Sequence, residues 1–329
     1  MFPESFNGNV MTTVQTSTVS EYHEPYYYVV HSVLYTLSVL LNSVVVFVIL
    51  RSERLRTPTN FLIASLATTD TIYAVGEAGY AIETLLIMNT GRAFMPNSRA
   101  WLSFVSSMYV CGKMSNYFHL MSIAFERWVY IVRPFLHERL VGNKRICLIL
   151  VIIWLFSFFA GLDILIKQQV VNSVKDAPVR FALVYPIVHF LCSAVICTVY
   201  VHIAIISHRH MQAIQAQELS FLAAANERHR LRSLKSNWKI VRMVITVFGM
   251  FFLTVTPVVC LHAYLVHSNT SMTNMARQIL PLLAATHYCS NFFVFFSQCK
   301  MFRDMLFFCK SKVKVGALGG NNVSVNTLS

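Results

Sequence analysis

Charged residues are scarce in this chain. Asp, Glu, Lys and Arg make up 12% of its 329 residues, against roughly 25% in a typical soluble domain. Acidic residues are the rarer kind, with 14 Asp and Glu against 27 Lys and Arg and a formal net charge of +13. This composition favours a protein embedded in lipid, and it leaves little room for a separate soluble domain.

Enzyme and metal-binding motifs are also missing. None of the eight cysteines forms a Cys-x-x-Cys pair, so we expect no zinc site. The chain has no His-Glu-x-x-His, Gly-x-Ser-x-Gly or phosphate-binding glycine loop, so we expect no enzyme. Residues 1–25 lack the basic and apolar parts of a cleavable signal peptide. We expect them to form an extracellular N-terminus, with the first span acting as the insertion signal.

Long apolar runs dominate what is present. A helix crosses a bilayer in about 20 residues, and the runs lack the two-residue alternation of barrel strands. The sequence predicts an all-α membrane protein, a bundle of seven transmembrane helices over 26–296. An amphipathic helix over 297–310 and a cytoplasmic tail over 311–329 follow it. The predicted spans are 26–50, 60–88, 101–132, 146–164, 181–206, 240–266 and 279–296.

Lys and Arg are divided unevenly between the two ends of the spans. Twenty of the 27 lie in or beside the connectors after spans one, three and five, or in the tail. The positive-inside rule therefore places the N-terminus outside the cell and the tail in the cytosol. We expect the basic side to meet anionic lipid and a cytosolic partner, not nucleic acid. Asn269, in an Asn-Thr-Ser sequon, then faces outward as a glycosylation site.

Several motif residues follow one another in a fixed order along the spans: Asn42, Leu66, Ala67, Asp70, Glu126, Arg127, Trp128, Pro134, Trp154, Pro186 and Pro257. Their order and spacing resemble the rhodopsin-like (class A) family of G-protein-coupled receptors over nearly the whole chain. The resemblance implies a plasma-membrane receptor that converts an extracellular ligand (a peptide, lipid or small molecule) into activation of a heterotrimeric G protein. The alternative is a decoy or chemosensory receptor with atypical or absent G-protein signalling.

Asp70 lies deep in the second span. A carboxylate at that depth costs roughly 2.5 to 3.5 kcal/mol on insertion scales, so it is expected to face the interior and find partners. Asn116 and Asn291 are the expected partners. In similar receptors such a cluster holds an allosteric sodium ion, and its oxygens suit a hard cation. The alternative is a hydrogen-bonded contact between helices. No other cofactor is expected.

Glu126 and Arg127 end the third span. Arg127 is expected to pair with Glu126 in the closed bundle, and the resemblance implies that activation frees it to meet the G protein. Phe135, just past Pro134, resembles the loop residue that inserts into that partner. The plainer alternatives are an interfacial anchor for Arg127 and an exposed aromatic at the membrane interface for Phe135.

Two prolines interrupt predicted spans. Proline removes a backbone hydrogen bond and kinks a helix, so Pro186 and Pro257 are the expected hinges. Movement at Pro257 would open a cytosolic cleft at the inner end of the sixth span. In the family a tryptophan lies two residues before this proline, where this chain has Val255. Phe251, six residues before Pro257, is expected to take over part of the role of that tryptophan.

Lys113 and Glu77 are predicted to lie in the outer half of the membrane. Lys113 comes 14 residues before Arg127, about 21 Å along a helix. These two residues either pair with each other or, together with Tyr109, contact a ligand. Amine receptors of the family keep an aspartate at the place of Tyr109, which disfavours an amine. Span seven also lacks the lysine that a retinal-binding receptor needs.

Other positions depart from the family pattern or concern modification. Leu102 replaces an expected outer cysteine, Thr254-Val255-Thr256 replaces Cys-Trp-x before Pro257, and Asn291-Phe292 replaces Asn-Pro in span seven. These changes motivate the decoy alternative. Cys309, at the end of the amphipathic helix, is either palmitoylated or an ordinary reduced cysteine.

Overall fold

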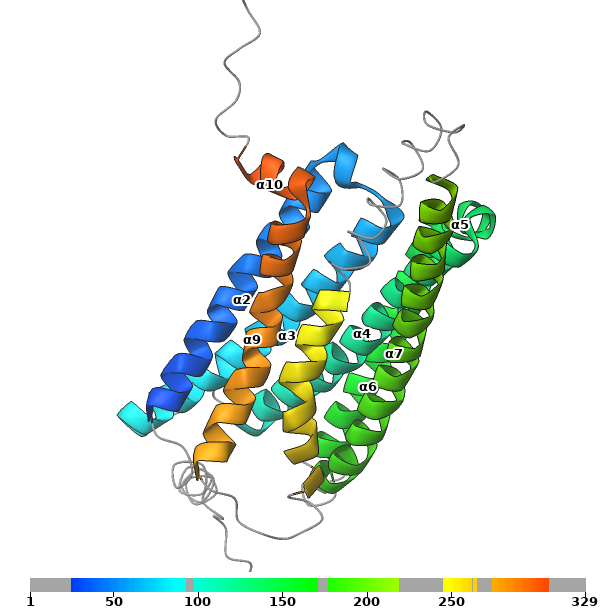
Figure 1. Ribbon diagram of the computed structural model, residues 1–329. Helices are drawn as coiled ribbons and strands as arrows, with labels where there is room; N and C mark the ends of the chain where they lie inside the picture. The colour runs from blue at the N-terminus through cyan, green and yellow to red at the C-terminus, as the bar shows by residue number, and fades with distance from the viewer. Residues whose placement is uncertain are drawn as a thin grey trace, which may run out of the picture.

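The computed structural model describes residues 25–92, 98–170, 177–218, 245–261, 263–264 and 274–307. Within these ranges the regular structure is helical, and seven long helices run side by side as a bundle (Figure 1). The fold class predicted from the sequence is therefore confirmed. The glycosylation and palmitoylation candidates, Asn269 and Cys309, lie outside the described residues. The long helices are α2 (Pro25–Arg51), α3 (Pro58–Thr90), α4 (Ser98–Val132), α6 (Asn143–Val170), α7 (Ala177–Glu218), the helix Ile245–Leu261 and α9 (Asn274–Gln298).

Short elements join the long helices at the end of the bundle that the sequence predicts to face the cytosol, which we call the inner end. The 3-10 turn η1 (Glu53–Leu55) follows α2, and α5 (Pro134–Leu140) follows α4. α3 begins with a capped first turn, because the Thr57 side chain accepts a hydrogen bond from the Asn60 amide and Pro58 fits the first helical position. It ends at Thr90, and the next residue, Gly91, caps it with a φ of 65°, a left-handed conformation that glycine adopts without strain.

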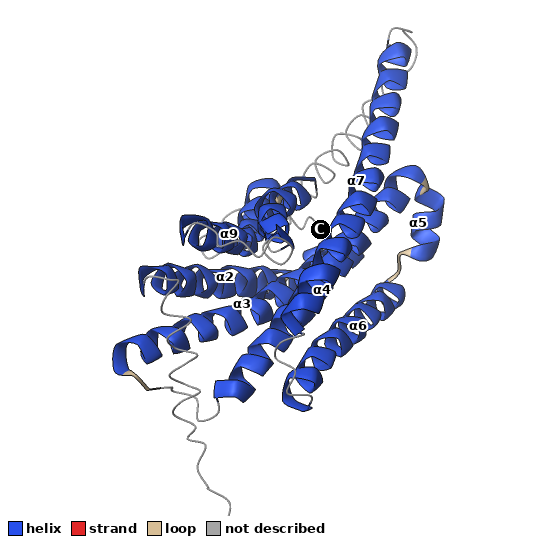
Figure 2. Ribbon diagram, turned by 90° about the horizontal axis from the view of Figure 1, so that it is seen from below, coloured by secondary structure: helices blue, strands red, loops and turns tan. Residues whose placement is uncertain are grey.

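α4 is the central helix of the bundle. It packs against α3, α6 and α7, whereas α2 packs against α3 and α9. In Figure 2, where the molecule is seen from below, α4 lies between α3 and α6. Side chains on α4 therefore meet partners from most of the bundle, which explains why its candidate residues Lys113, Asn116, Glu126 and Arg127 are buried.

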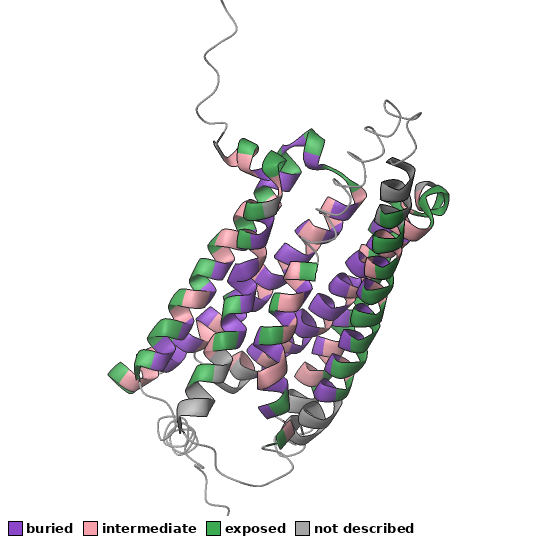
Figure 3. Cartoon of the chain, viewed as in Figure 1, coloured by how far each residue is buried: buried purple, intermediate pink, exposed green. Residues whose placement is uncertain are grey.

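The helices differ in how apolar they are. By length and composition, three described segments are suited to cross a membrane: Pro25–Arg51, Asn143–Ile166 and Tyr185–Arg209. Only 17% of the apolar window of α6 is buried, and exposed side chains run along α7 (Figure 3). α3 and α4 are less apolar than these three segments because they carry residues such as Asp70 and Lys113, which are 0% and 3% exposed. Their polar side chains face the interior, as expected in a membrane bundle.

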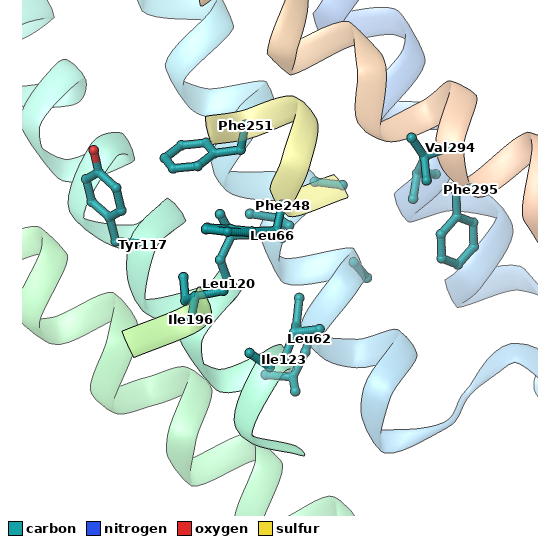
Figure 4. Packing of buried hydrophobic residues seen from close by; sticks show 14 of the residues in the cluster. Leu62, Leu66, Tyr117, Leu120, Ile123, Ile196, Phe248, Phe251, Val294 and Phe295 are labelled. Atoms are coloured by element: carbon teal, nitrogen blue, oxygen red, sulfur yellow. The ribbon is translucent and has the colours of Figure 1, made fainter. Parts of the chain in front are cut away.

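A hydrophobic cluster fills the inner half of the bundle. Phe251 lies edge-on to Tyr117, with ring centroids 5.4 Å apart and an interplanar angle of 87°. Figure 4 shows the two side chains next to each other above a layer of further apolar side chains. That layer joins α3, α4, α7 and the helix Ile245–Leu261, and its members include Leu62, Leu66, Leu120, Ile123, Ile196 and Phe248.

α10 (Lys300–Phe307) follows α9 after one residue. It lies within the amphipathic segment 297–310 predicted from the sequence, although residues 297 and 298 still belong to α9. Phe302 is fully buried and meets Phe295 of α9 edge-on, with centroids 5.1 Å apart. This contact fixes the turn between α9 and α10.

Candidate functional site

Asp70 is the centre of a buried polar cluster in the middle of the bundle. The Asn116 Nδ2 donates to Asp70 Oδ1 at 2.9 Å, and the Asn291 Nδ2 donates to Asp70 Oδ2 at 2.6 Å. The three residues come from α3, α4 and α9, so the carboxylate ties these helices together. The structure thus brings together the three residues that the sequence grouped around Asp70.

Three amide oxygens in this cluster lack a donor. The Oδ1 atoms of Asn42, Asn116 and Asn291 are buried and have no hydrogen-bond partner among the described residues. Asn42 is fixed by its own amide group, which donates to the Ser38 carbonyl at 3.0 Å and the Tyr288 carbonyl at 2.8 Å. Buried acceptors of this kind are normally satisfied by water or an ion. We therefore count Asn42 as part of the cluster, although the sequence suggested it only as a motif residue.

A small cavity adjoins the cluster on its inner side. Its volume is about 30 Å³, and Asn42 and Asn291 are its polar lining, with apolar residues such as Leu120 and Ile123 around them. That space holds about one water molecule or a small ion. Among the described residues, no group of three His, Cys, Asp or Glu side chains is placed to bind a metal. One carboxylate and neutral amide oxygens suit a hard monovalent cation better than a transition metal.

Lys113 lies one turn outward of Asn116 on α4. Its ammonium stands over the rings of Tyr73, Tyr109 and Tyr288, at 5.2, 5.5 and 5.2 Å from their centroids. These are cation–π distances. Of the candidate ligand residues, Tyr109 therefore contacts Lys113 directly.

Glu77 forms a separate contact further outward. Its Oε2 lies 3.9 Å from Nε2 of His31 on α2. Glu77 and Lys113 attract each other electrostatically, and the Tyr73 side chain interacts with both of them. His31 was not predicted from the sequence, in which its only signal is a histidine within an apolar run.

Glu126 and Arg127 form an ion pair at the inner end of α4. Arg127 Nε lies 2.7 Å from Glu126 Oε2, and both residues are buried. The hydroxyl of Thr59 on α3 donates to Glu126 Oε1 at 3.0 Å and accepts from Arg127 Nη2. His137 on α5 lies 2.9 Å from the same Oε1 through its Nε2. We call these four side chains the inner cluster.

Thr59 and His137 are the residues of this cluster that sequence reasoning missed. Thr59 lies one residue past Pro58 in the first turn of α3, and His137 lies in a connector that was not expected to be helical. Neither position carries a periodic or charge signal that would link it to Glu126. Their contacts depend on how α3 and α5 are placed around α4, which is a tertiary property.

Phe135 begins the exposed edge of α5. It is 90% exposed, and α5 starts at Pro134, whose fixed backbone angle suits a first helical position. A large apolar side chain held outward on a helix fits an interaction surface better than packing within the bundle.

Both expected hinges lie inside helices. Pro186 is within α7, and Pro257 is within Ile245–Leu261. His189 connects the two helices and α4: its Nδ1 lies 2.7 Å from the Tyr117 hydroxyl and its Nε2 lies 2.9 Å from the Thr256 hydroxyl. Thr256 precedes Pro257, so this link joins the hinge region to α4.

The chain matches the family model described as "7 transmembrane receptor (rhodopsin family)" over residues 41–295. It is 31% identical to the 5-hydroxytryptamine receptor 1E of Cavia porcellus over 130 residues, which is 40% of this chain and 34% of that receptor. It is 24% identical to Melanopsin-A of Danio rerio over 313 residues, which is 84% of this chain and 51% of that protein. The chain thus spans about half or less of these curated relatives.

A solved structure agrees with the fold. The crystal structure of squid rhodopsin superposes with a TM-score of 0.70 at 15% identity, covering 85% of this chain and 84% of that one. At this identity the likeness concerns the fold alone.

Proposed function

The chain belongs to the rhodopsin family of seven-transmembrane receptors, and from this premise we propose that it converts binding of an extracellular ligand into activation of a cytosolic heterotrimeric G protein. The observation that carries the proposal is the inner cluster, in which Arg127 is buried and paired with Glu126. A buried arginine at a helix end that faces the cytosol is poised to change partners. The family is one of receptors, not of enzymes.

The inner cluster is the closed state of the proposed switch. Thr59 and His137 both bind Glu126, so α3, α4 and α5 are held together at their inner ends. Release of Arg127 requires these contacts to loosen as the inner half of the helix Ile245–Leu261 swings about Pro257. A ligand favours the open form only as far as it binds that form more tightly.

Phe135 and the basic inner surface are the proposed docking site. Phe135 projects from α5, and α5 contacts the inner cluster through His137. Insertion of Phe135 into the G protein would thus act on the element that holds Glu126. Anionic lipid would share the basic surface.

The Asp70 cluster has the set of ligands that a sodium site requires. Asp70 supplies the charge, and the unpaired oxygens of Asn42, Asn116 and Asn291 supply neutral ligands, so these residues fit a sodium ion. A bound ion would neutralise Asp70 and stabilise the closed packing of α3, α4 and α9. The same residues also hold the helices together through their direct hydrogen bonds.

The ligand is proposed to enter from the outside toward Glu77, Tyr109 and Lys113, with the N-terminus on the extracellular side. Two relatives are named as a 5-hydroxytryptamine receptor and a melanopsin, yet neither an amine nor retinal is the preferred ligand here. Tyr109 stands where amine receptors keep an aspartate, and 279–296 contains no lysine. A peptide, a lipid and another small molecule stay open. Glycosylation at Asn269 and palmitoylation at Cys309 are further proposals.

Nucleotide exchange measured with the purified full-length receptor tests the proposal. The receptor is reconstituted in lipid discs with a panel of heterotrimeric G proteins, with and without a library of peptides and lipids. Wild type should accelerate exchange above empty discs, and Arg127→Ala should return it to that level. Arg92→Ala, an exposed arginine at the outer end of α3, is the matched control and should leave exchange unchanged. Equal exchange by wild type, Arg127→Ala and empty discs would favour the decoy.

A further inference from the structure

The Asp70 cluster is covered on its outer side by a second layer built on the same three helices. Each of α3, α4 and α9 contributes one residue to the cluster and another three residues outward. Three residues rise about 4.5 Å along a helix, so the second layer lies directly on the first. The pairs are Asp70 with Tyr73, Asn116 with Lys113, and Asn291 with Tyr288.

Lys113 is the one charge in this second layer among the described residues. Its ammonium stands 5.2 Å from the ring centroids of both Tyr73 and Tyr288, and only 3% of the residue is exposed. Aromatic faces attract a cation but carry no net charge. A lysine sealed inside a membrane bundle needs an opposite charge nearby, so the tyrosines position the ammonium without neutralising it.

Two carboxylates flank the ammonium, and they differ in their other partners. Glu77, on the outer side, is the larger electrostatic partner of Lys113, and it also interacts with Tyr73 and lies 3.9 Å from His31. Asp70, on the inner side, receives its hydrogen bonds from the neutral amides of Asn116 and Asn291. Among the described residues, Lys113 supplies the positive charge that acts on Asp70. Its charge is therefore shared between Glu77 and Asp70.

We propose that Lys113 is a tethered counter-ion for Asp70, so that this chain carries in its own sequence the positive charge that the Asp70 site would otherwise take from sodium. The inference rests on the proposed role of Asp70 in the closed state. A sodium ion in the same site would lie beside the ammonium, at a separation of about one helical turn. Repulsion at about 5 Å would weaken sodium binding on the order of a hundredfold.

The consequence is a receptor whose closed state is stable without sodium. Removal of the ammonium converts the site into an ordinary cation site, because Asp70 and the unpaired oxygens of Asn42, Asn116 and Asn291 stay in place. The gain of a sodium response is therefore the signature of the proposal. A lysine that only fills space among the tyrosines would leave no such signature when replaced.

Thermal unfolding of the purified full-length receptor tests this inference independently of G-protein activation. Sodium chloride is exchanged for N-methyl-D-glucamine chloride at constant ionic strength, in wild type, Lys113→Met and Lys113→Gln. The melting temperature of wild type should be the same in both salts. The Lys113 variants should melt about 2–4 °C higher in sodium. Binding of radioactive sodium should appear in the variants and be absent in wild type.

Two further variants complete the test. Lys144→Met, an exposed lysine at the start of α6, should behave as wild type. Asp70→Asn combined with Lys113→Gln should lose the sodium response, because the site then lacks its carboxylate. A sodium-dependent melting temperature in wild type, or none in either Lys113 variant that folds, overturns the proposal. Because no readout here involves nucleotide exchange, these outcomes stay decisive even if the receptor activates no G protein.

Discussion

The two buried charge clusters of this bundle are built in opposite ways. In the inner cluster the opposite charges are neighbours on one helix, Glu126 and Arg127, and they contact each other directly. In the Asp70 cluster the carboxylate is bonded to neutral amides, and the positive charge stands one turn away on Lys113. The inner cluster also reaches the surface, since the His137 side chain is 19% exposed, whereas Asp70 is 0% exposed.

Because of this difference, the contacts within the two clusters respond to different kinds of change. A protein that binds α5 can pull on Glu126 through His137 without entering the membrane. Nothing as large as a protein reaches Asp70, so that cluster responds to the position of the Lys113 ammonium and to small shifts of the surrounding helices. The inner cluster therefore suits a partner-driven step, and the Asp70 cluster suits an adjustment of the resting state.

The largest effect should come from removal of the Asp70 carboxylate. Asp70→Ala leaves the buried amides of Asn116 and Asn291 without their acceptor, at about 1–3 kcal/mol for each unsatisfied group, and it leaves Lys113 without its nearest inner carboxylate. We expect a clear loss in the melting temperature of the purified receptor. Asp70→Asn, which keeps one acceptor, should lose less. Equal stability of Asp70→Ala and wild type would mean that the cluster does not hold the helices together.

A second test sharpens the contrast by acting only at the cytosolic end. Phe135→Ala should lower G-protein-dependent nucleotide exchange by about tenfold, the scale of a buried aromatic anchor in an interface. The melting temperature should not change, because Phe135 is 90% exposed. Leu136→Ala, a less exposed apolar neighbour, is the matched control. A fall in melting temperature with unchanged exchange would remove Phe135 from the docking site.

Thr59 tests whether the inner cluster is held from α3. Thr59→Val keeps the shape of the side chain but removes the hydroxyl that links Glu126 and Arg127. Loss of about 1 kcal/mol from the closed state should raise basal nucleotide exchange by roughly fivefold. Thr68→Val is the control, because the Thr68 hydroxyl donates only within α3, to the Ala64 carbonyl at 2.9 Å. Basal exchange that does not rise would place the closed-state contact elsewhere.

The seven-helix fold was predictable because its signal is local. Each span is a long apolar run, and these runs remain recognisable although they contain single buried polar residues such as Asp70. The contacts of Asp70 with Asn116 and Asn291 were also predictable, since spacing along three helices puts all three residues at one depth. The contact between Glu126 and Arg127 was predictable too, because the two residues are adjacent opposite charges at the end of an apolar span.

The rest depends on which helix faces meet. Lys113 and Glu77 have comparable depths, so the sequence allowed them to form a pair. The structure shows that the Tyr73 and Tyr288 rings enclose the Lys113 ammonium, while His31 of α2 approaches Glu77. Helix rotation decides between these arrangements, and one sequence does not encode rotation in a readable form. Thr59 and His137 escaped prediction for the same reason.

The smallest effect should arise at His137, and it decides whether α5 controls the inner cluster. The imidazole touches Glu126 Oε1 at 2.9 Å and meets the Tyr130 ring edge-on at 4.9 Å, but it is partly exposed, so its removal should weaken the closed state by only about 0.5 kcal/mol. His137→Ala should therefore raise basal exchange about twofold. Combined with Thr59→Val, it should add less than its separate effect, because both side chains hold the same carboxylate oxygen and contacts that share a partner are not additive. Arg139→Ala, an exposed neighbour on α5, controls for changes in the helix itself. Full additivity of His137→Ala and Thr59→Val would mean that the two helices act on the switch independently, and the link from α5 through Glu126 to Arg127 would then be wrong.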